Sequence, residues 1–92
     1  MQSATVSATS GSFLVQIGAA KNEASANEEI DRLAKKHPDI LAGLSGAVIR
    51  VDLGDKGVWY RMRVGPFASR IKANGVCGQL KAVDVGCFVV TN

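Results

Sequence analysis

The 92-residue sequence is poor in the residues that build metal centres, redox motifs and membrane spans. It has one histidine and two cysteines, too few for a four-ligand zinc site, and the cysteines are not spaced as C-x-x-C. No stretch approaches the roughly 18 apolar residues of a membrane-spanning helix. There is no G-x-x-x-x-G-K-[ST] phosphate loop. The sequence therefore argues against most metalloenzyme and thiol-redox chemistries, and it predicts no cofactor and no metal.

What is present is the composition of a globular domain, with 47% hydrophobic and 21% charged residues. The net charge of +3 falls short of the dense basic face of a duplex-DNA binder. Residues 1–10 are small and polar, without the cationic start and apolar core of a signal peptide. We expect them to form a disordered tail or linker ahead of a folded domain at residues 11–92. Any signal or anchor would then lie upstream in a longer parent protein.

Hydrophobic periodicity predicts the element order β-α-β-β-α-β. Strands are expected at residues 13–17, 47–53, 58–64 and 85–91. One helix should run from about Asn22 to His37 and end before Pro38, with a connector at 39–46. A second helix should begin after an N-cap at Ser69 and run to about Val83. Gly65-Pro66 is expected to break the third strand. This order predicts an α+β, ribonucleoprotein-like fold with a four-stranded antiparallel sheet and two helices on one face.

The second and third strands should form a hairpin around Gly54-Asp55-Lys56-Gly57. Pairing outward from that turn sets Leu53 opposite Val58 and Arg50 opposite Arg61. The apolar face, which the helices should cover, then holds Ile49, Val51, Tyr60, Met62 and Val64. The uncovered face of the whole sheet would display Leu14, Gln16, Val48, Arg50, Asp52, Trp59, Arg61, Arg63, Phe88 and Val90.

That uncovered face is the candidate binding surface. Aromatic rings beside arginine forks suit sugar rings or nucleobases, and such enrichment is typical of binding surfaces. The alternative is a half-solvated face that touches a partner domain. No catalytic residue is predicted, because His37 should be a solvent-exposed residue at a helix C-terminus and Asp52 should orient its neighbours.

The two cysteines, Cys77 and Cys87, are both predicted to face inward on consecutive elements. This placement allows the short Cα separation that a disulfide needs. The alternative is two buried free thiols that pack as small hydrophobic groups. The disulfide is favoured, and it would indicate an oxidising compartment.

Three segments resemble the SPOR domain, the sporulation-related repeat of bacterial cell-envelope proteins. Residues 13–19 (FLVQIGA) are similar to its opening φ-x-V-Q-φ-G-A/S, and residues 60–67 (YRMRVGPF) to its Y-R-V-x-V/I-G-P-F block. Leu80-Lys81 followed by residues 86–90 (GCFVV) resembles its closing L-K…G-x-x-x-φ. The resemblance covers about residues 11–91. It departs from the family at Ala20, where an aromatic residue is usual, and in an insertion at 38–46.

The resemblance implies the same fold and a non-catalytic, monomeric module that binds peptidoglycan. By this resemblance, the module should prefer glycan strands stripped of stem peptides. It should act in the periplasm or cell envelope, often at division septa. The resemblance also implies no membrane contact by the domain itself and leaves room for a separate catalytic domain in the parent protein. By motif position Gln16 and the arginines of the third strand become candidate glycan contacts. With the rest of the uncovered face, the candidate set is Gln16, Arg50, Trp59, Arg61, Arg63 and Phe88.

Two other functions use the same surface. A protein–protein interaction module could dock a partner on the open sheet. A single-stranded RNA-binding module would need [KR]-G-[FY]-[GA]-F-V-x-[FY] on the third strand, and residues 59–67 do not provide it. No nucleic-acid partner is therefore expected.

Overall fold

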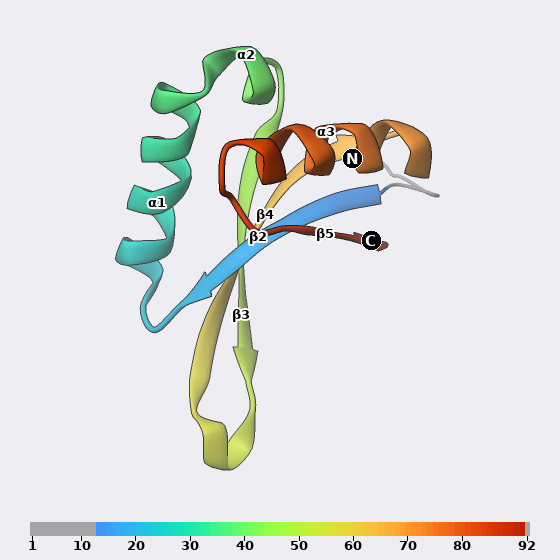
Figure 1. Cartoon of the computed structure of the whole chain (residues 1–92). Coiled ribbons are helices and arrows are strands. Elements are labelled where there is room, and N and C mark those ends of the chain that lie inside the picture. Colours follow the sequence, from blue (N-terminus) through green and yellow to red (C-terminus); the bar gives the residue numbers. More distant parts are fainter. Residues whose placement is uncertain (1–12, 92) are drawn as a thin grey trace, which may run out of the picture.

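A computed structural model describes residues 13–91, so the predicted tail at 1–10 lies outside the described residues. The elements in chain order are β2 (Phe13–Ala20), α1 (Glu23–Lys36), α2 (Pro38–Leu41), β3 (Ser45–Asp52), η1 (Gly54–Lys56), β4 (Val58–Phe67), α3 (Arg70–Ala82) and β5 (Phe88–Thr91). The strands form one antiparallel sheet in the order β3-β4-β2-β5 (Figure 1). This confirms the predicted fold class.

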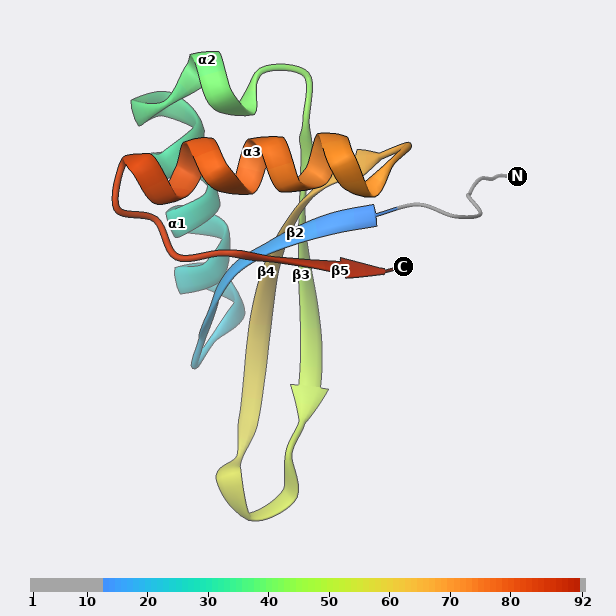
Figure 2. The same cartoon turned by 45° about the vertical axis from the view of Figure 1, so that its right-hand side comes forward.

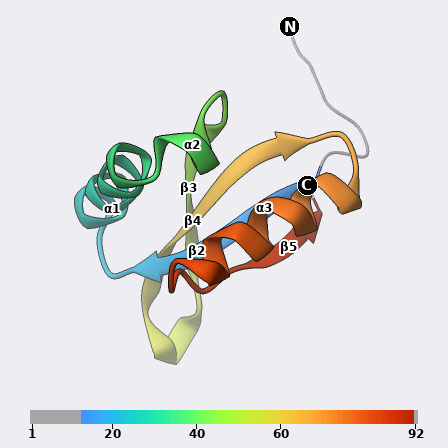
Figure 3. The same cartoon turned by 45° about the horizontal axis from the view of Figure 1, so that its top comes forward.

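The helices lie on one side of the sheet, with α3 over β2 and β5 and with α1 near β3 and β4 (Figure 3). The connector expected at 39–46 is in fact partly helical, because α2 starts at Pro38 and buries Leu41. Proline suits the first turn of a helix, where its missing N–H has no partner to lose. Pro38 therefore ends one helix and begins the next.

Local side-chain contacts define the two long helices. The Asn22 side chain accepts a hydrogen bond from the Ser25 N–H (2.8 Å), and Ser69 Oγ accepts one from the Lys72 N–H (3.2 Å). These are N-caps, and the one at Ser69 was predicted. On the exposed face of α1, Arg32 donates hydrogen bonds to Glu29 and thereby lowers the pKa of that carboxyl.

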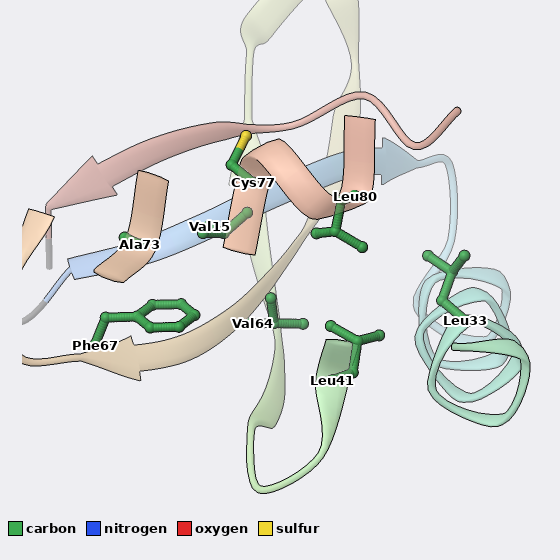
Figure 4. Close-up of a cluster of buried hydrophobic side chains, with 8 residues drawn as sticks. All are labelled: Val15, Leu33, Leu41, Val64, Phe67, Ala73, Cys77 and Leu80. Carbon is green, nitrogen blue, oxygen red and sulfur yellow. The ribbon is translucent and has the colours of Figure 1, made fainter. Parts of the chain in front are cut away.

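The hydrophobic core fills the space between the sheet and the helices (Figure 4). Its buried members come from strands β2 and β4 and from all three α-helices, and they are Val15, Leu33, Leu41, Val64, Phe67, Ala73, Cys77 and Leu80. The β3–β4 hairpin extends beyond the helices (Figure 2). Tyr60 lies on the helix side of this hairpin, as predicted, but it is only half-buried. Met62 is the buried residue of that face, 5% exposed.

The predicted hairpin register is wrong by one residue. Asp52, rather than Leu53, pairs with Val58. Leu53 leaves the strand (φ −103°, ψ 23°) and donates its N–H to the Gly57 carbonyl at 2.9 Å. Gly57 has φ 87°, a conformation that favours glycine, and this turns its carbonyl toward Leu53.

The one-residue shift exchanges the two faces of β3. Arg50 pairs with Tyr60 and lies on the helix side of the sheet, together with Val48 and Asp52. Ala47, Ile49 and Val51 take their place on the open face. The assignments of Arg50 to the binding face and of Ile49 and Val51 to the core are therefore corrected.

The expected break at Gly65-Pro66 is also corrected, because β4 continues to Phe67. The register between β2 and β4 shifts here, so that Leu14 faces the Gly65-Pro66 pair. A Cβ on Gly65 would lie 2.8 Å from Leu14 Cδ2, which explains why glycine stands at this close approach. A β-bulge accommodates the proline within the strand.

Candidate functional site: the open sheet face

The candidate residues lie in rows that cross the strands of the open face. Gln16 of β2 pairs with Arg63 of β4 on one side and with Phe88 of β5 on the other. The row ends at Ala47, which pairs with Arg63 from β3. Three of the six predicted site residues, Gln16, Arg63 and Phe88, are therefore direct cross-strand neighbours.

The centre of this row is a fixed polar pair. Arg63 Nε donates a hydrogen bond to Gln16 Oε1 at 3.0 Å. The Gln16 side chain is 9% exposed, so it is held almost completely beneath its neighbours. A buried glutamine whose carbonyl is satisfied keeps its amide N–H groups as donors. The hydrogen bond holds the half-buried Arg63 guanidinium in a defined orientation on this face.

A second row places Arg61 between Ile49 of β3 and Ala19 of β2. Small and apolar neighbours leave room beside the aliphatic stem of the arginine. Arg61 and Arg63 are two residues apart on one strand, so their Cα atoms lie about 7 Å apart on the same face. Together they form a short cationic line along β4.

Trp59 stands at the hairpin end of the same line, opposite Val51. Its indole N–H donates to the Lys56 carbonyl at 3.0 Å, which ties the ring to the turn. The Lys21 ammonium lies 4.4 Å from the ring centroid, in a cation–π contact. Trp59 is half-buried, and Lys21 covers part of one ring face.

Phe88 is the more accessible aromatic residue, with 56% of its surface exposed. The preceding residue, Cys87, is bonded to Cys77 of α3, with a Cα separation of 5.7 Å. The predicted disulfide is confirmed, and the alternative of two free thiols is wrong. The bond fastens the start of β5, and with it Phe88, to the helix layer.

The corrected register changes the character of the face. Among residues 13–91, the strand positions on this side are Leu14, Gln16, Ala19, Ser45, Ala47, Ile49, Val51, Trp59, Arg61, Arg63, Gly65, Phe88 and Val90. None of these is acidic, whereas the predicted face contained Asp52. Sequence reasoning missed the apolar residues of β3. Only the conformation of the turn, through Leu53 and Gly57, could have revealed them.

The described part of the chain encloses no pocket and holds no group of three or more metal-ligating side chains. None of its helices, from α1 to α3, is long and apolar enough to cross a membrane. His37 ends α1, where its backbone N–H donates to the Leu33 carbonyl at 2.8 Å.

Comparison with known proteins identifies the family. The SPOR domain family model matches residues 9–91. The peptidoglycan-binding domain of the cell wall lytic enzyme CwlC from B. subtilis has 27% identity and a TM-score of 0.64, over 94% of this chain and 95% of that one. The RlpA SPOR domain from Pseudomonas aeruginosa has 18% identity and a TM-score of 0.65, over 85% and 96%. A search of curated proteins gave no significant match. Because the family model spans almost all of the chain, this protein belongs to the SPOR domain family.

Proposed function

We propose that this domain binds peptidoglycan through its open sheet face, and that the ligand is the glycan strand. The observation that carries the proposal is the match of almost the whole chain to the SPOR family, together with the similarity to a domain described as peptidoglycan-binding. The Gln16–Arg63 pair and Arg61 supply a polar, cationic surface suited to an anionic polysaccharide. Binding, not catalysis, is the function of the domain.

The two arginines recognise carboxylates. A glycan strand without stem peptides carries free lactyl carboxylates on its muramic acid residues. Arg61 and Arg63 form charge-assisted hydrogen bonds with such groups, and these are stronger than neutral ones. Because the face has no acidic strand residue within 13–91, none of its strand side chains repels the ligand.

The selectivity for stripped strands follows from the same chemistry. A stem peptide is attached to the glycan through the lactyl carboxylate, so its presence removes the charge that the arginines recognise. It also adds bulk over a flat surface. The intact strand is therefore disfavoured by an unpaired arginine and by steric conflict.

The aromatic residues have different roles. Phe88 is exposed beside Gln16 and stacks on the face of a sugar ring. Trp59 is tied to the turn and already contacts Lys21, so it closes the hairpin end of the site. Ligand contact along the line from Arg63 to Trp59 would span about 13 Å, because four residues of strand separate them.

The domain directs its parent protein, as a monomeric module, to the bacterial cell wall or division septum. The Cys77–Cys87 disulfide supports an extracytoplasmic location, since such bonds persist in oxidising compartments.

Co-sedimentation with purified sacculi, before and after amidase removes the stem peptides, tests the proposal. Wild-type protein should bind better to the treated sacculi. Arg61→Ala should lose most of this binding and keep its melting temperature. Arg50→Ala is the matched control, because it removes an exposed arginine from the opposite face of the same sheet. Equal loss in both variants, or equal binding to treated and untreated sacculi, would contradict the proposal.

Gln16→Ala and Arg63→Ala should also abolish binding, but each breaks the hydrogen bond of a nearly buried pair. Arg63→Ala leaves the Gln16 carbonyl without its partner at a cost of about 1–3 kcal/mol. Arg61→Ala is therefore the cleaner probe. Gel shifts with single-stranded RNA at physiological salt should show no complex. A tight RNA complex that depends on Arg61 would instead favour an RNA-binding module.

A further inference from the structure

An apolar strip runs along β3 on the open face, made of Ala47, Ile49 and Val51. Ile49 is 39% exposed, although a branched apolar residue in a strand usually faces a core. The helices lie on the other side of the sheet (Figure 3), so none of them covers this strip. Ile49 is exposed, and Ala47 and Val51 are half-buried.

The strip lies directly beside the proposed glycan contacts. Ala47 pairs with Arg63, Ile49 with Arg61, and Val51 with Trp59. Adjacent strands are about 4.8 Å apart, so a ligand whose carboxylates meet the two arginines also lies over the neighbouring apolar side chains. The surface therefore suits a chain that carries negative charge and small apolar groups side by side.

We propose that the apolar strip binds the N-acetyl methyl groups of the glycan and makes Ile49 a specificity-determining residue. This inference rests on the proposed function. Both amino sugars of peptidoglycan carry an N-acetyl group, whose methyl is their most apolar part. The preferred ligand is accordingly an N-acetylated, carboxylated amino-sugar polymer, and an anionic polysaccharide without acetamido groups binds less well.

A second copy of this chain fits the strip poorly. Two copies placed face to face would bring Arg61 and Arg63 of each copy toward those of the other, and like charges at close range are destabilising. An anionic polymer neutralises the same residues. Charge complementarity therefore selects the glycan over self-association.

Sacculi that differ only in the acyl group test this inference. Amidase-treated sacculi are de-N-acetylated enzymatically, and their amines are then reacylated with either a formyl or an acetyl group. Both products are neutral amides, so the comparison isolates the methyl group from any change of charge. Wild-type protein should bind N-acetyl sacculi more tightly than N-formyl sacculi, by about fourfold for each methyl that is fully covered.

Two matched variants assign the effect to the strip. Ile49→Thr keeps a β-branched side chain in the strand but replaces the ethyl branch by a hydroxyl, and it should remove the preference for N-acetyl sacculi. Ile71→Thr makes the same change at a residue of α3 that is 83% exposed, and it should retain the preference. Val51→Thr provides a second strip variant should Ile49→Thr melt early.

The possible failures are distinguishable. If wild-type protein binds neither kind of sacculus, the proposed function itself is wrong. If it binds N-formyl and N-acetyl sacculi equally well, peptidoglycan binding stands and the role of the strip is refuted. The role is also refuted if Ile49→Thr keeps the acetyl preference, or if the variant changes the oligomeric state in size-exclusion chromatography and leaves sacculus binding intact.

Discussion

Reducing the disulfide between Cys77 and Cys87 should destabilise the domain and weaken the anchoring of β5. The bond joins α3, where Cys77 is 5% exposed, to the residue before the shortest β-strand of the sheet. β5 pairs only with β2, through four residue pairs from Phe13–Thr91 to Gln16–Phe88. The covalent link therefore adds to the pairing with β2 and to the core packing of Val89 in holding this edge of the open face.

The magnitude follows from the length of the closed loop. The two cysteines are 10 residues apart in sequence. In the chain-entropy description, a loop of this length restricts the unfolded chain by about 9 cal/mol/K, which is about 2.7 kcal/mol at 25 °C. For a domain of this size, such a loss lowers the melting temperature by about 10–20 °C.

The assay is thermal unfolding, followed by circular dichroism, of oxidised protein and of protein reduced with a phosphine. The oxidised form should have a mass two hydrogen atoms below that of the reduced form and should resist alkylation. As a control, the reductant should not change the melting temperature of the variant with Cys77→Ala and Cys87→Ala. If reduced and oxidised wild-type protein melt within about 2 °C of each other, the loop-closure argument fails.

Four further substitutions test the packing of the helix layer and of the sheet beneath it. Met62→Ala should destabilise the fold by about 2–5 kcal/mol in chemical denaturation, because Met62 is nearly fully buried. Gly75→Ala and Gly78→Ala should each stabilise the protein by about 0.5–1 kcal/mol, because both lie within α3 and a Cβ would meet nothing within 4 Å. A lower stability of either variant would contradict this reasoning. Gly46→Ala should cost about 1–3 kcal/mol, because its Cβ would lie 2.6 Å from Ile30 Cγ2. The cost of Gly46→Ala should be smaller when it is measured in a chain that already carries Ile30→Ala.

Much of the fold could be predicted because its signals are local. Ser69 begins α3 because its side chain accepts a hydrogen bond from a backbone N–H three residues later, a pattern visible in sequence. The disulfide was predictable because the faces of α3 and of the last strand both follow from periodicity. The alternation of Phe13, Val15 and Ile17 likewise predicted which side of β2 packs against the core.

The hairpin register could not be predicted, because it depends on the conformation of the turn more than on its composition. The segment around Gly54-Asp55-Lys56-Gly57 indicates a turn equally well whether Leu53 is the last residue of the strand or the first of the turn. The hydrogen bonds that decide between these are Leu53 N–H to the Gly57 carbonyl and Gly54 N–H to Asp52 Oδ1. The apolar residues Val48, Ile49 and Val51 of β3 fall on both faces of the strand, so the hydrophobic pattern did not indicate which register is right.

The revised position of Arg50 has a consequence for solubility. β3 is an edge strand, and its outer backbone groups are a template on which another extended chain could form hydrogen bonds. Arg50 and Asp52 are exposed on this edge, on the side away from the apolar strip. Charged side chains on an edge strand oppose stacking into fibres, because an incoming strand would have to desolvate them. The arginine that seemed suited to a ligand thus helps to protect the domain from aggregation.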